Sequence, residues 1–136
     1  MPYVKYGDRK EIAELFGKTL VSVTVNSSKD EIRFVTDDVV TYVMWHDQGC
    51  CEHVYVESIV GDLADLVGSP ILKAEEATSY ARPTDVPAPE YANDSETWTF
   101  YKLATIKGYV DIRWHGSSNG YYSESVDFGV ETTDDA

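Results

Sequence analysis

The sequence predicts an α+β fold of mainly antiparallel β-sheet, with six or seven strands in two meanders, one N-terminal helix and a short helical turn. Polar and apolar residues alternate in residues 18–45 and again in residues 98–128, as they do in half-buried strands. Segments rich in Asn, Ser, Asp and Gly interrupt both stretches and predict turns. A chain of 136 residues fits a single domain, so we expect residues 1–136 to share one core.

The first element is expected to be an amphipathic helix over residues 8–16. Asp8 can cap its N-terminus, and Glu11 lies at the capping-box position three residues further on. A shorter helical turn is expected over residues 61–67, where Asp62 is the capping residue.

The central part of the chain is less regular. Residues 53–59 can form a strand, and residues 71–77 fit either a strand or a helix. Residues 79–95 are expected to be a mobile loop, because prolines and acidic residues replace large apolar side chains there. We therefore expect an ordered core over about residues 8–130, followed by an acidic tail at residues 131–136.

The charge of the chain limits its partners. Acidic residues outnumber basic ones by 24 to 11, and the formal net charge at pH 7 is −13. This charge repels nucleic acid phosphates and anionic lipid headgroups, so we expect no direct binding to nucleic acid or to membranes. The sequence has no apolar run of roughly 20 residues and no apolar signal-peptide stretch at its N-terminus. We therefore expect a soluble intracellular protein.

The acidic residues are distributed unevenly along the sequence. Nine lie in residues 30–65, together with a single basic residue, Arg33. An acidic surface can dock a basic surface of another protein, although a solvated face that only improves solubility is the alternative. The residues expected to bind a partner are Asp37, Asp38, Asp47, Glu52 and Glu57.

A cluster of reactive or metal-capable side chains comprises His46, Cys50, Cys51 and His53. The two cysteines are adjacent, and a bond between neighbours departs from ordinary disulfide geometry, so we expect two free thiols. The preferred interpretation is one buried and one partly exposed thiol at a bend. Zinc binding and a cysteine nucleophile activated by histidine remain alternatives, and we expect no cofactor.

A second candidate site lies near the C-terminus. Its residues combine a guanidinium group, an amide and aromatic faces on a glycine-containing hairpin, which suits a planar or phosphorylated small molecule. The alternative is an ordinary hairpin flanked by the aromatic residues of a sheet. The candidate binding residues are Arg113, Trp114, Asn119, Tyr121 and Tyr122.

Several segments carry a resemblance to a known family, namely residues 45–52, 59–72, 74–76, 97–102 and 113–126. They include two motifs, HDQGCCE at residues 46–52 and RWHGSSNGYYSESV at residues 113–126. With these HDQ-x-CCE and RW-x-G-x-SNGYYSE-x-V motifs, the chain resembles a family of small, uncharacterised proteins encoded largely by tailed bacteriophages and prophages. The resemblance covers roughly residues 16–128 and brings no established activity. It implies a phage accessory protein that acts in the cytoplasm of an infected bacterial cell.

These observations favour a non-enzymatic protein that binds and inhibits or redirects a host factor, with anti-defence as the simplest version. The expected partner is a host bacterial protein, such as a basic nucleic-acid-binding or defence protein. A protein that sequesters a nucleotide signal is the alternative from a different class. A small thiol-dependent or metal-dependent enzyme is a third.

Overall fold

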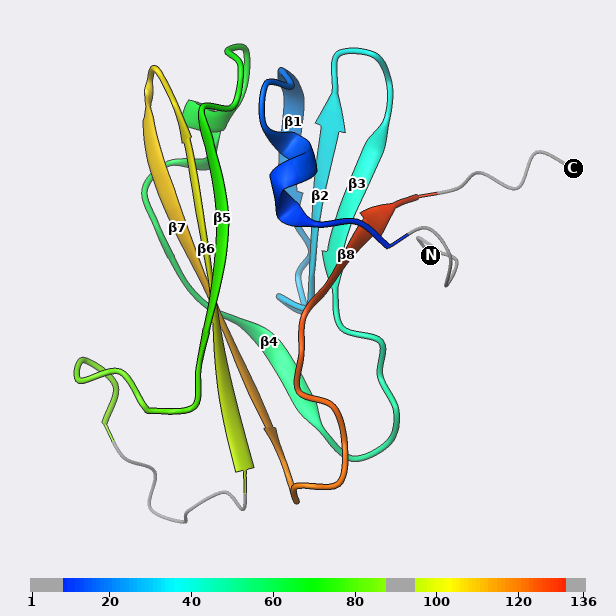
Figure 1. Ribbon diagram of the computed structural model, residues 1–136, viewed down its shortest axis with the longest axis vertical. Coiled ribbons are helices and arrows are strands. Elements are labelled where there is room, and N and C mark those ends of the chain that lie inside the picture. Colours follow the sequence, from blue (N-terminus) through cyan, green and yellow to red (C-terminus); the bar gives the residue numbers. More distant parts are fainter. Residues whose placement is uncertain (1–8, 88–94, 132–136) are drawn as a thin grey trace, which may run out of the picture.

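Two four-stranded antiparallel sheets face each other in the computed structural model, which describes residues 9–87 and 95–131 (Figure 1). The first sheet has the strand order β1-β2-β3-β8, and the second has the order β4-β7-β6-β5. The strands are β1 (Leu20–Val25), β2 (Glu31–Thr36), β3 (Thr41–Trp45), β4 (His53–Val60), β5 (Lys73–Ser79), β6 (Ser95–Thr105), β7 (Gly108–Ser118) and β8 (Asp127–Val130).

The predicted meander in residues 18–45 is confirmed, because β1, β2 and β3 pair in sequence order. The expected alternation is clearest in β2, where Ile32, Phe34 and Thr36 are buried and the residues between them are partly exposed. The turn between β1 and β2 is held by Asn26, whose Oδ1 accepts hydrogen bonds from two backbone amides. Local sequence therefore determines this part of the fold.

The prediction of a second self-contained meander is wrong. β6 and β7 form the expected hairpin, but β8 leaves this sheet and pairs with β3 in the first one. Phe128 of β8 stacks on Tyr42 of β3 with 5.5 Å between the ring centroids, so an apolar contact between distant segments favours this pairing. With β4 and β5 added, the described residues form eight strands rather than six or seven.

The predicted N-terminal helix is also wrong. Only a single 3-10 turn, η2 (Ile12–Leu15), forms there. Glu11 occupies the cap position but makes no capping hydrogen bond through its side chain, and Asp8 lies outside the described residues. A very short helix has few hydrogen bonds to offset its nucleation cost, so the burial of Ile12 and Leu15 decides the local conformation. The described fold is therefore β-rich and lacks the α-helix that we expected.

The second helical turn is confirmed as a 3-10 turn, η3 (Leu63–Leu66). The Asp62 side chain accepts a hydrogen bond from the amide of Ala64, as a capping residue does. Residues 71–77, which fitted a strand or a helix, contribute to the edge strand β5. No helix in the described part of the chain is long and apolar enough to span a membrane.

Both sheets contribute to one hydrophobic core. Trp114 of β7 is fully buried, and its Nε1 donates a hydrogen bond to Sδ of Met44 on β3 at 3.1 Å. This contact joins the two sheets across the sandwich. The other large and fully buried core side chains are Leu15, Leu20, Ile32, Phe34, Leu66, Ile71, Tyr101, Leu103 and Ile112.

Residues 80–87 follow β5 with no regular secondary structure. Arg82 anchors them, because its guanidinium group lies 2.8 Å from Oε2 of Glu96 and also contacts the ring of Trp98. Residues 88–94 of the predicted mobile loop lie outside the described residues, as do residues 132–136 of the predicted tail.

Candidate functional site

The two motif segments meet at one end of the sandwich, the lower end in Figure 1. Residues 46–52 connect β3 to β4, and residues 119–126 connect β7 to β8. His46 joins the two connections, because its Nδ1 lies 2.6 Å from the carbonyl oxygen of Ser125. The ring of Tyr122 lies beside Gly49, where an added Cβ would be 3.7 Å from Cδ1 of the ring. We call these two connections and their contact surface the motif end.

Glu52 organises the first connection. Its Oε2 accepts hydrogen bonds from the amide of Gly49 and from Nε2 of His46, both at 2.7 Å, and its Oε1 accepts one from the amide of Cys50 at 2.8 Å. Gln48 closes the loop from the other side by donating its Nε2 to the carbonyl oxygen of Glu52 at 2.6 Å. The polar residues of the first motif therefore bond mainly to one another.

This arrangement stabilises the ionised form of Glu52. The backbone amides of Gly49 and Cys50, followed by the His46 side chain, lower the pKa of Glu52 from 4.5 to about 2. His46 has a carbonyl oxygen beside one ring nitrogen and an ionised carboxylate beside the other. Both ring nitrogens of His46 are therefore engaged, one by each of these two groups.

Glu52 was expected to be part of an exposed acidic docking surface, and this expectation is wrong. Its side chain is only 1% exposed, because the loop folds over it. Composition cannot distinguish such an inward-facing acid from the exposed acids around it. The relevant signal is the short spacing from His46 to Glu52, which allows a loop to close on its own carboxylate.

The expectation of two free thiols is also wrong, because Cys50 and Cys51 are joined in a disulfide. The bond closes a small ring through the peptide bond between the two residues. A disulfide offers no thiolate to a substrate or a metal ion. Both residues are exposed, so the bond lies on the surface of the motif end.

The disulfide predicts a simple mass difference. The intact mass of the unreduced protein is expected to be lower than that of the reduced protein by two hydrogen atoms, and a thiol reagent should leave the unreduced protein unmodified. Mass spectrometry before and after reduction measures both effects. An identical mass in the two states would contradict the bond.

The cluster of histidines and cysteines does not assemble as a metal site. The ring of His53 stacks on Tyr55, with 4.6 Å between centroids, while His46 bonds to Glu52 and Ser125. Within residues 9–87 and 95–131, no three His, Cys, Asp or Glu side chains are grouped to hold a metal ion.

Glu124 organises the second connection. Its carboxyl group is buried and accepts hydrogen bonds from the hydroxyl groups of Thr97, at 2.7 Å, and Ser118. Ser118 also accepts a hydrogen bond from the amide of Gly120, which shapes the turn after β7. Gly116 allows this packing, because a Cβ there would lie 2.7 Å from the backbone oxygen of Glu124.

Replacing Gly116 with alanine is therefore expected to destabilise the protein by about 1 to 3 kcal/mol, as overpacking usually does. Urea unfolding measures this change. The matched control is Gly120→Ala, where a Cβ meets no atom within 4 Å and only the backbone conformation, with φ at +94°, opposes the substitution. Equal and small effects at both positions would contradict the packing role of Gly116.

The structure does not bring the expected small-molecule residues together. Trp114 faces the core, whereas Arg113, the preceding residue on β7, faces the outside of the second sheet. There Arg113 pairs with Glu57 and Asp85, and the hydrogen bond with Asp85 is the main cause of its raised pKa. Arg113 and Trp114 therefore lie on opposite faces of the second sheet.

The remaining residues of that expected site lie elsewhere. Asn119, Tyr121 and Tyr122 lie at the motif end, in the turn after β7. Tyr121 is 87% exposed and Tyr122 is 37% exposed. These two rings are therefore available to a partner, although Arg113 and Trp114 are not part of the same surface.

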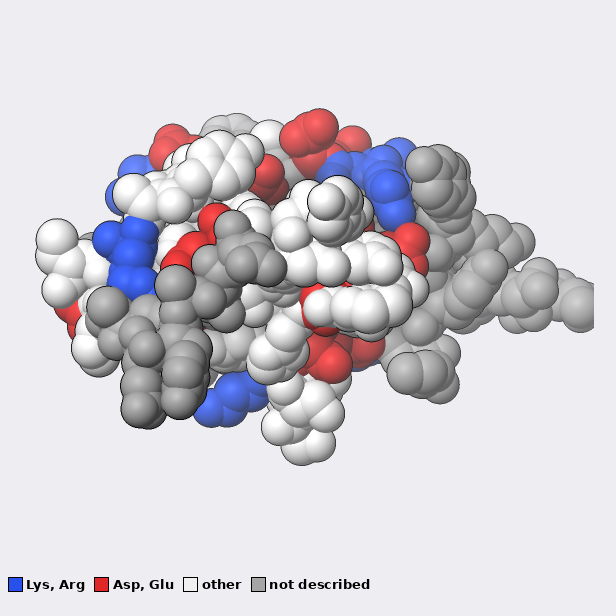
Figure 2. Space-filling view, turned by 90° about the horizontal axis from the view of Figure 1, so that it is seen from below, with Lys and Arg blue, Asp and Glu red and all other residues white. Residues whose placement is uncertain are grey.

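The acidic residues expected to bind a partner do not share one surface either. Asp37 and Asp38 precede β3 and Asp47 follows it, so they lie at opposite ends of a five-residue strand, about 16 Å apart. Glu57 lies at a β-bulge in β4 and pairs with Arg113. Figure 2 shows the lower end of the molecule, where acidic side chains lie among uncharged ones rather than in one block.

A cleft of about 460 Å³ opens beside the first motif, between the β1–β2 turn and the start of β4. Trp45 and Tyr55 contribute aromatic walls, and Asp30 and Glu31 contribute acidic groups. Sequence reasoning missed this cleft, because its walls come from strands in different sheets. The main-chain hydrogen bond from Val56 to the carbonyl oxygen of Lys29, at 2.6 Å, joins those sheets there.

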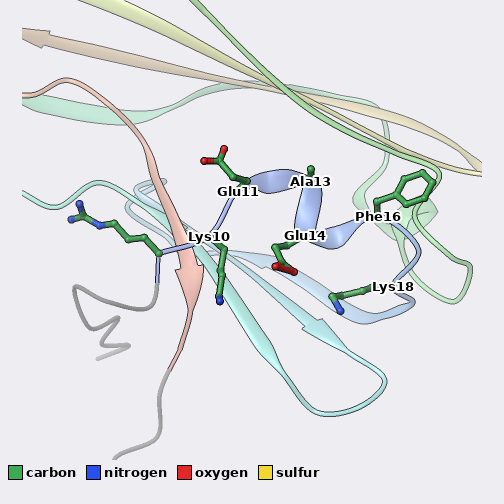
Figure 3. Close-up of a pocket in the computed structure, with 7 residues that line it drawn as sticks. Lys10, Glu11, Ala13, Glu14, Phe16 and Lys18 are labelled. Carbon is green, nitrogen blue, oxygen red and sulfur yellow. The ribbon is translucent and has the colours of Figure 1, made fainter.

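A shallower hollow of about 730 Å³ lies beside η2 (Figure 3). Lys10, Glu14 and Lys18 extend on one side of this turn, and Glu11 extends on the other. These charged side chains extend away from one another and do not surround a common point. We therefore place the candidate site at the motif end.

The fold and this site define a class of protein: an antiparallel β-sandwich with two loops joined at one end, each organised by a buried carboxyl group. The chain belongs to the family described as "Domain of unknown function (DUF7448)", whose model matches residues 13–128. No curated protein and no solved structure matches the chain.

Proposed function

We propose that this protein is a non-enzymatic binding protein, and that it docks a basic surface of another protein through the motif end. The observation that carries the proposal is the division of roles within the two motifs. Buried carboxyl groups, Glu52 and Glu124, hold the loops in place, while Tyr121 and the Cys50–Cys51 disulfide remain exposed. Loops fixed on a rigid scaffold are a common way to present a binding surface.

Two features favour binding over catalysis at this end. His46 has both ring nitrogens engaged, by Ser125 and Glu52, so it lacks a free nitrogen to act as a base. The two sulfur atoms are bonded to each other and offer no nucleophile. Tyrosine, in contrast, is enriched in protein interfaces, because its ring contributes contact area and its hydroxyl group tolerates water.

The charge of the chain supports a basic partner. The formal net charge is −13, and Asp30, Glu31 and Asp47 lie around the cleft and the first motif. Complementary charge at the rim of an interface mainly accelerates association and makes it depend on salt. The resemblance to phage-encoded proteins supports a host protein as the partner, such as a nucleic-acid-binding or defence protein in the cytoplasm of the infected cell.

The experiment compares three forms of the protein as baits in a bacterial lysate: the natural chain, Tyr121→Ala, and the double variant Asp37→Asn and Asp38→Asn. The double variant alters the opposite end of β3 and serves as the control. Any captured protein is then purified, and its association rate is measured at several salt concentrations.

We expect Tyr121→Ala to weaken binding about tenfold or more, as loss of an interface tyrosine can do. The control variant should change the affinity by less than about twofold, and association should slow as salt rises. A partner that is lost with the control variant but kept by Tyr121→Ala would contradict the motif end as the docking surface.

A further inference from the structure

Residues 80–87, which we call the strap, lie against the outer face of the second sheet, the face turned away from the core (Figure 1). Beneath them lies Trp98 of β6, which pairs with His115 of β7. Because Trp114, the neighbour of His115 in β7, points into the core, His115 and Trp98 point the other way. Trp98 is nevertheless only 1% exposed. This outer part of the sheet is therefore covered, and the strap contributes to its cover.

Arg82 of the strap lies over Trp98 and is held there by two groups of the sheet. Its guanidinium carbon is 5.6 Å from the centroid of the Trp98 ring, and its Nη2 is 2.8 Å from Oε2 of Glu96. An aromatic face beside a carboxylate is well suited to a guanidinium group. The other hydrogen bond of Arg82 stays within the strap, because Nη1 donates to the carbonyl oxygen of Pro87 at 3.2 Å. The groups that recognise the guanidinium would therefore remain on the sheet if the strap moved away.

The sheet keeps an excess of negative charge around Trp98 without the strap. Its charged side chains there are Glu57, Glu96 and Arg113, which makes two carboxyl groups against one guanidinium group. Arg113 is engaged by Glu57, to which its Nε donates at 2.8 Å. In the described parts of the chain, Arg82 is the lysine or arginine that forms an ion pair with Glu96. A carboxylate that is mostly buried favours a cation beside it, so the place vacated by Arg82 suits another basic side chain.

His115 provides an independent observation at the same place. Its ring packs against that of Trp98 with 4.4 Å between centroids, and the residue is 8% exposed. Its Nε2 lies 3.2 Å from Oε1 of Glu96, whereas Nδ1 is buried and has no hydrogen-bond partner in the described structure. Buried polar atoms are nearly always hydrogen-bonded, so this one points to a missing polar ligand. An arginine that is not tied to the strap would have the donor that Arg82 gives to Pro87 free for this nitrogen.

The strap is held weakly enough to be displaced. Besides Arg82, it contacts the sheet through Asp85, whose two carboxylate oxygens accept hydrogen bonds from Arg113 at 3.1 and 3.2 Å. The Asp85 side chain is 67% exposed. Exposed ion pairs contribute little to stability and are screened by salt. A basic segment of another protein can therefore compete with the strap for the sheet.

We propose that the face around Trp98 binds an arginine side chain of another protein, and that Arg82 occupies this site until that arginine displaces it. The strap is then an autoinhibitory segment, and its own arginine shows which chemical group the site accepts. Arginine is one of the residues that contribute most to binding at protein interfaces. The proposal does not depend on docking at the motif end.

The test uses two peptides as probes. One is acetyl-YARPTDVP-amide, which has the sequence of residues 80–87, and the other carries alanine in place of its arginine. Binding is followed by NMR at the indole N–H of Trp98, which donates to Glu96. The opened variant combines Arg82→Ala with Asp85→Ala, and the matched control combines Arg33→Ala with Glu131→Ala, which removes an ion pair from the first sheet. Asp85→Asn alone is a milder variant that changes one exposed side chain.

We expect the opened variant to bind the arginine peptide saturably and about tenfold more tightly than the natural chain does, because Arg82 no longer competes. Asp85→Asn should also tighten binding, by a smaller factor. The alanine peptide should bind the opened variant at least about tenfold more weakly. The control variant and Tyr121→Ala should match the natural chain within about twofold. Equal binding of the two peptides, equal affinity of the opened variant and the natural chain, or no saturable binding to the opened variant would overturn the proposal.

Discussion

Replacing Glu52 with glutamine is expected to lower the melting temperature by roughly 5 to 10 °C. The new amide group keeps the size of the side chain but brings hydrogen-bond donors to a site that already contains the amides of Gly49 and Cys50 and the ring of His46. Donors would then face donors around a buried side chain. Thermal unfolding followed by circular dichroism measures the change.

The matched control is Glu57→Gln. This substitution removes the same charge from a side chain that is 21% exposed and pairs with Arg113 on the outer face of the second sheet. Partly exposed ion pairs contribute little to stability, so the control should lower the melting temperature by only a few degrees. Equal losses in the two variants would contradict the central position of Glu52.

Glu52→Gln should also change how the stability of the protein depends on pH in acid. The pKa of Glu52 in the folded protein is about 2, below its ordinary value of 4.5. The stabilisation from its ionised form is therefore complete above about pH 4.5 and is lost as pH falls towards 2. The difference in urea midpoint between the natural chain and Glu52→Gln should shrink over this window. A difference that stays constant from pH 7 to pH 2 would contradict the assignment.

Replacing Trp114 with alanine is expected to lower the free energy of unfolding by about 3 to 5 kcal/mol, the usual cost of removing a buried tryptophan. The side chain fills the space between the sheets and donates a hydrogen bond to Met44, so both packing and a polar contact are lost. Urea unfolding measures the change. Ile112→Val, in the same strand and also buried, should cost about 0.5 to 1.5 kcal/mol and remains measurable if the alanine variant does not fold.

This prediction also separates two roles for Trp114. A ligand-binding residue on a hairpin surface could be replaced at little cost to stability, as surface substitutions usually can. A loss of less than about 0.5 kcal/mol would therefore contradict the core position and support the small-molecule role expected from the sequence.

Alternation within single strands predicts much of this fold, because each strand carries its own buried face. The three strands of residues 18–45 and the hairpin of β6 and β7 are examples. The position of β8 could not be predicted in this way. It has four residues, and its pairing with β3 depends on contacts between distant segments, such as that of Phe128 with Tyr42.

The candidate site shows a similar limit. The sequence identified both motifs, but it did not show that their polar residues bond inward. The inward bonds of the first loop depend on Glu52, which looks like any other acid in an acidic chain, and on a carbonyl oxygen of Ser125 that belongs to the other motif. Adjacency in the sequence does not decide whether two cysteines are bonded, because the bond can close a small ring through the peptide bond between them.

Glu52 holds the first motif in one fixed conformation, and we propose that this fixed loop is part of a binding surface. Amide hydrogen exchange, followed by NMR at Gly49 and Cys50, tests it most directly. Both residues are exposed, yet their amides donate to the buried carboxylate. We expect slow exchange at both amides in the natural chain and faster exchange in Glu52→Gln, with little change in Glu57→Gln. Rapid exchange of both amides in the natural chain, at the rate of an unstructured loop, would contradict the account.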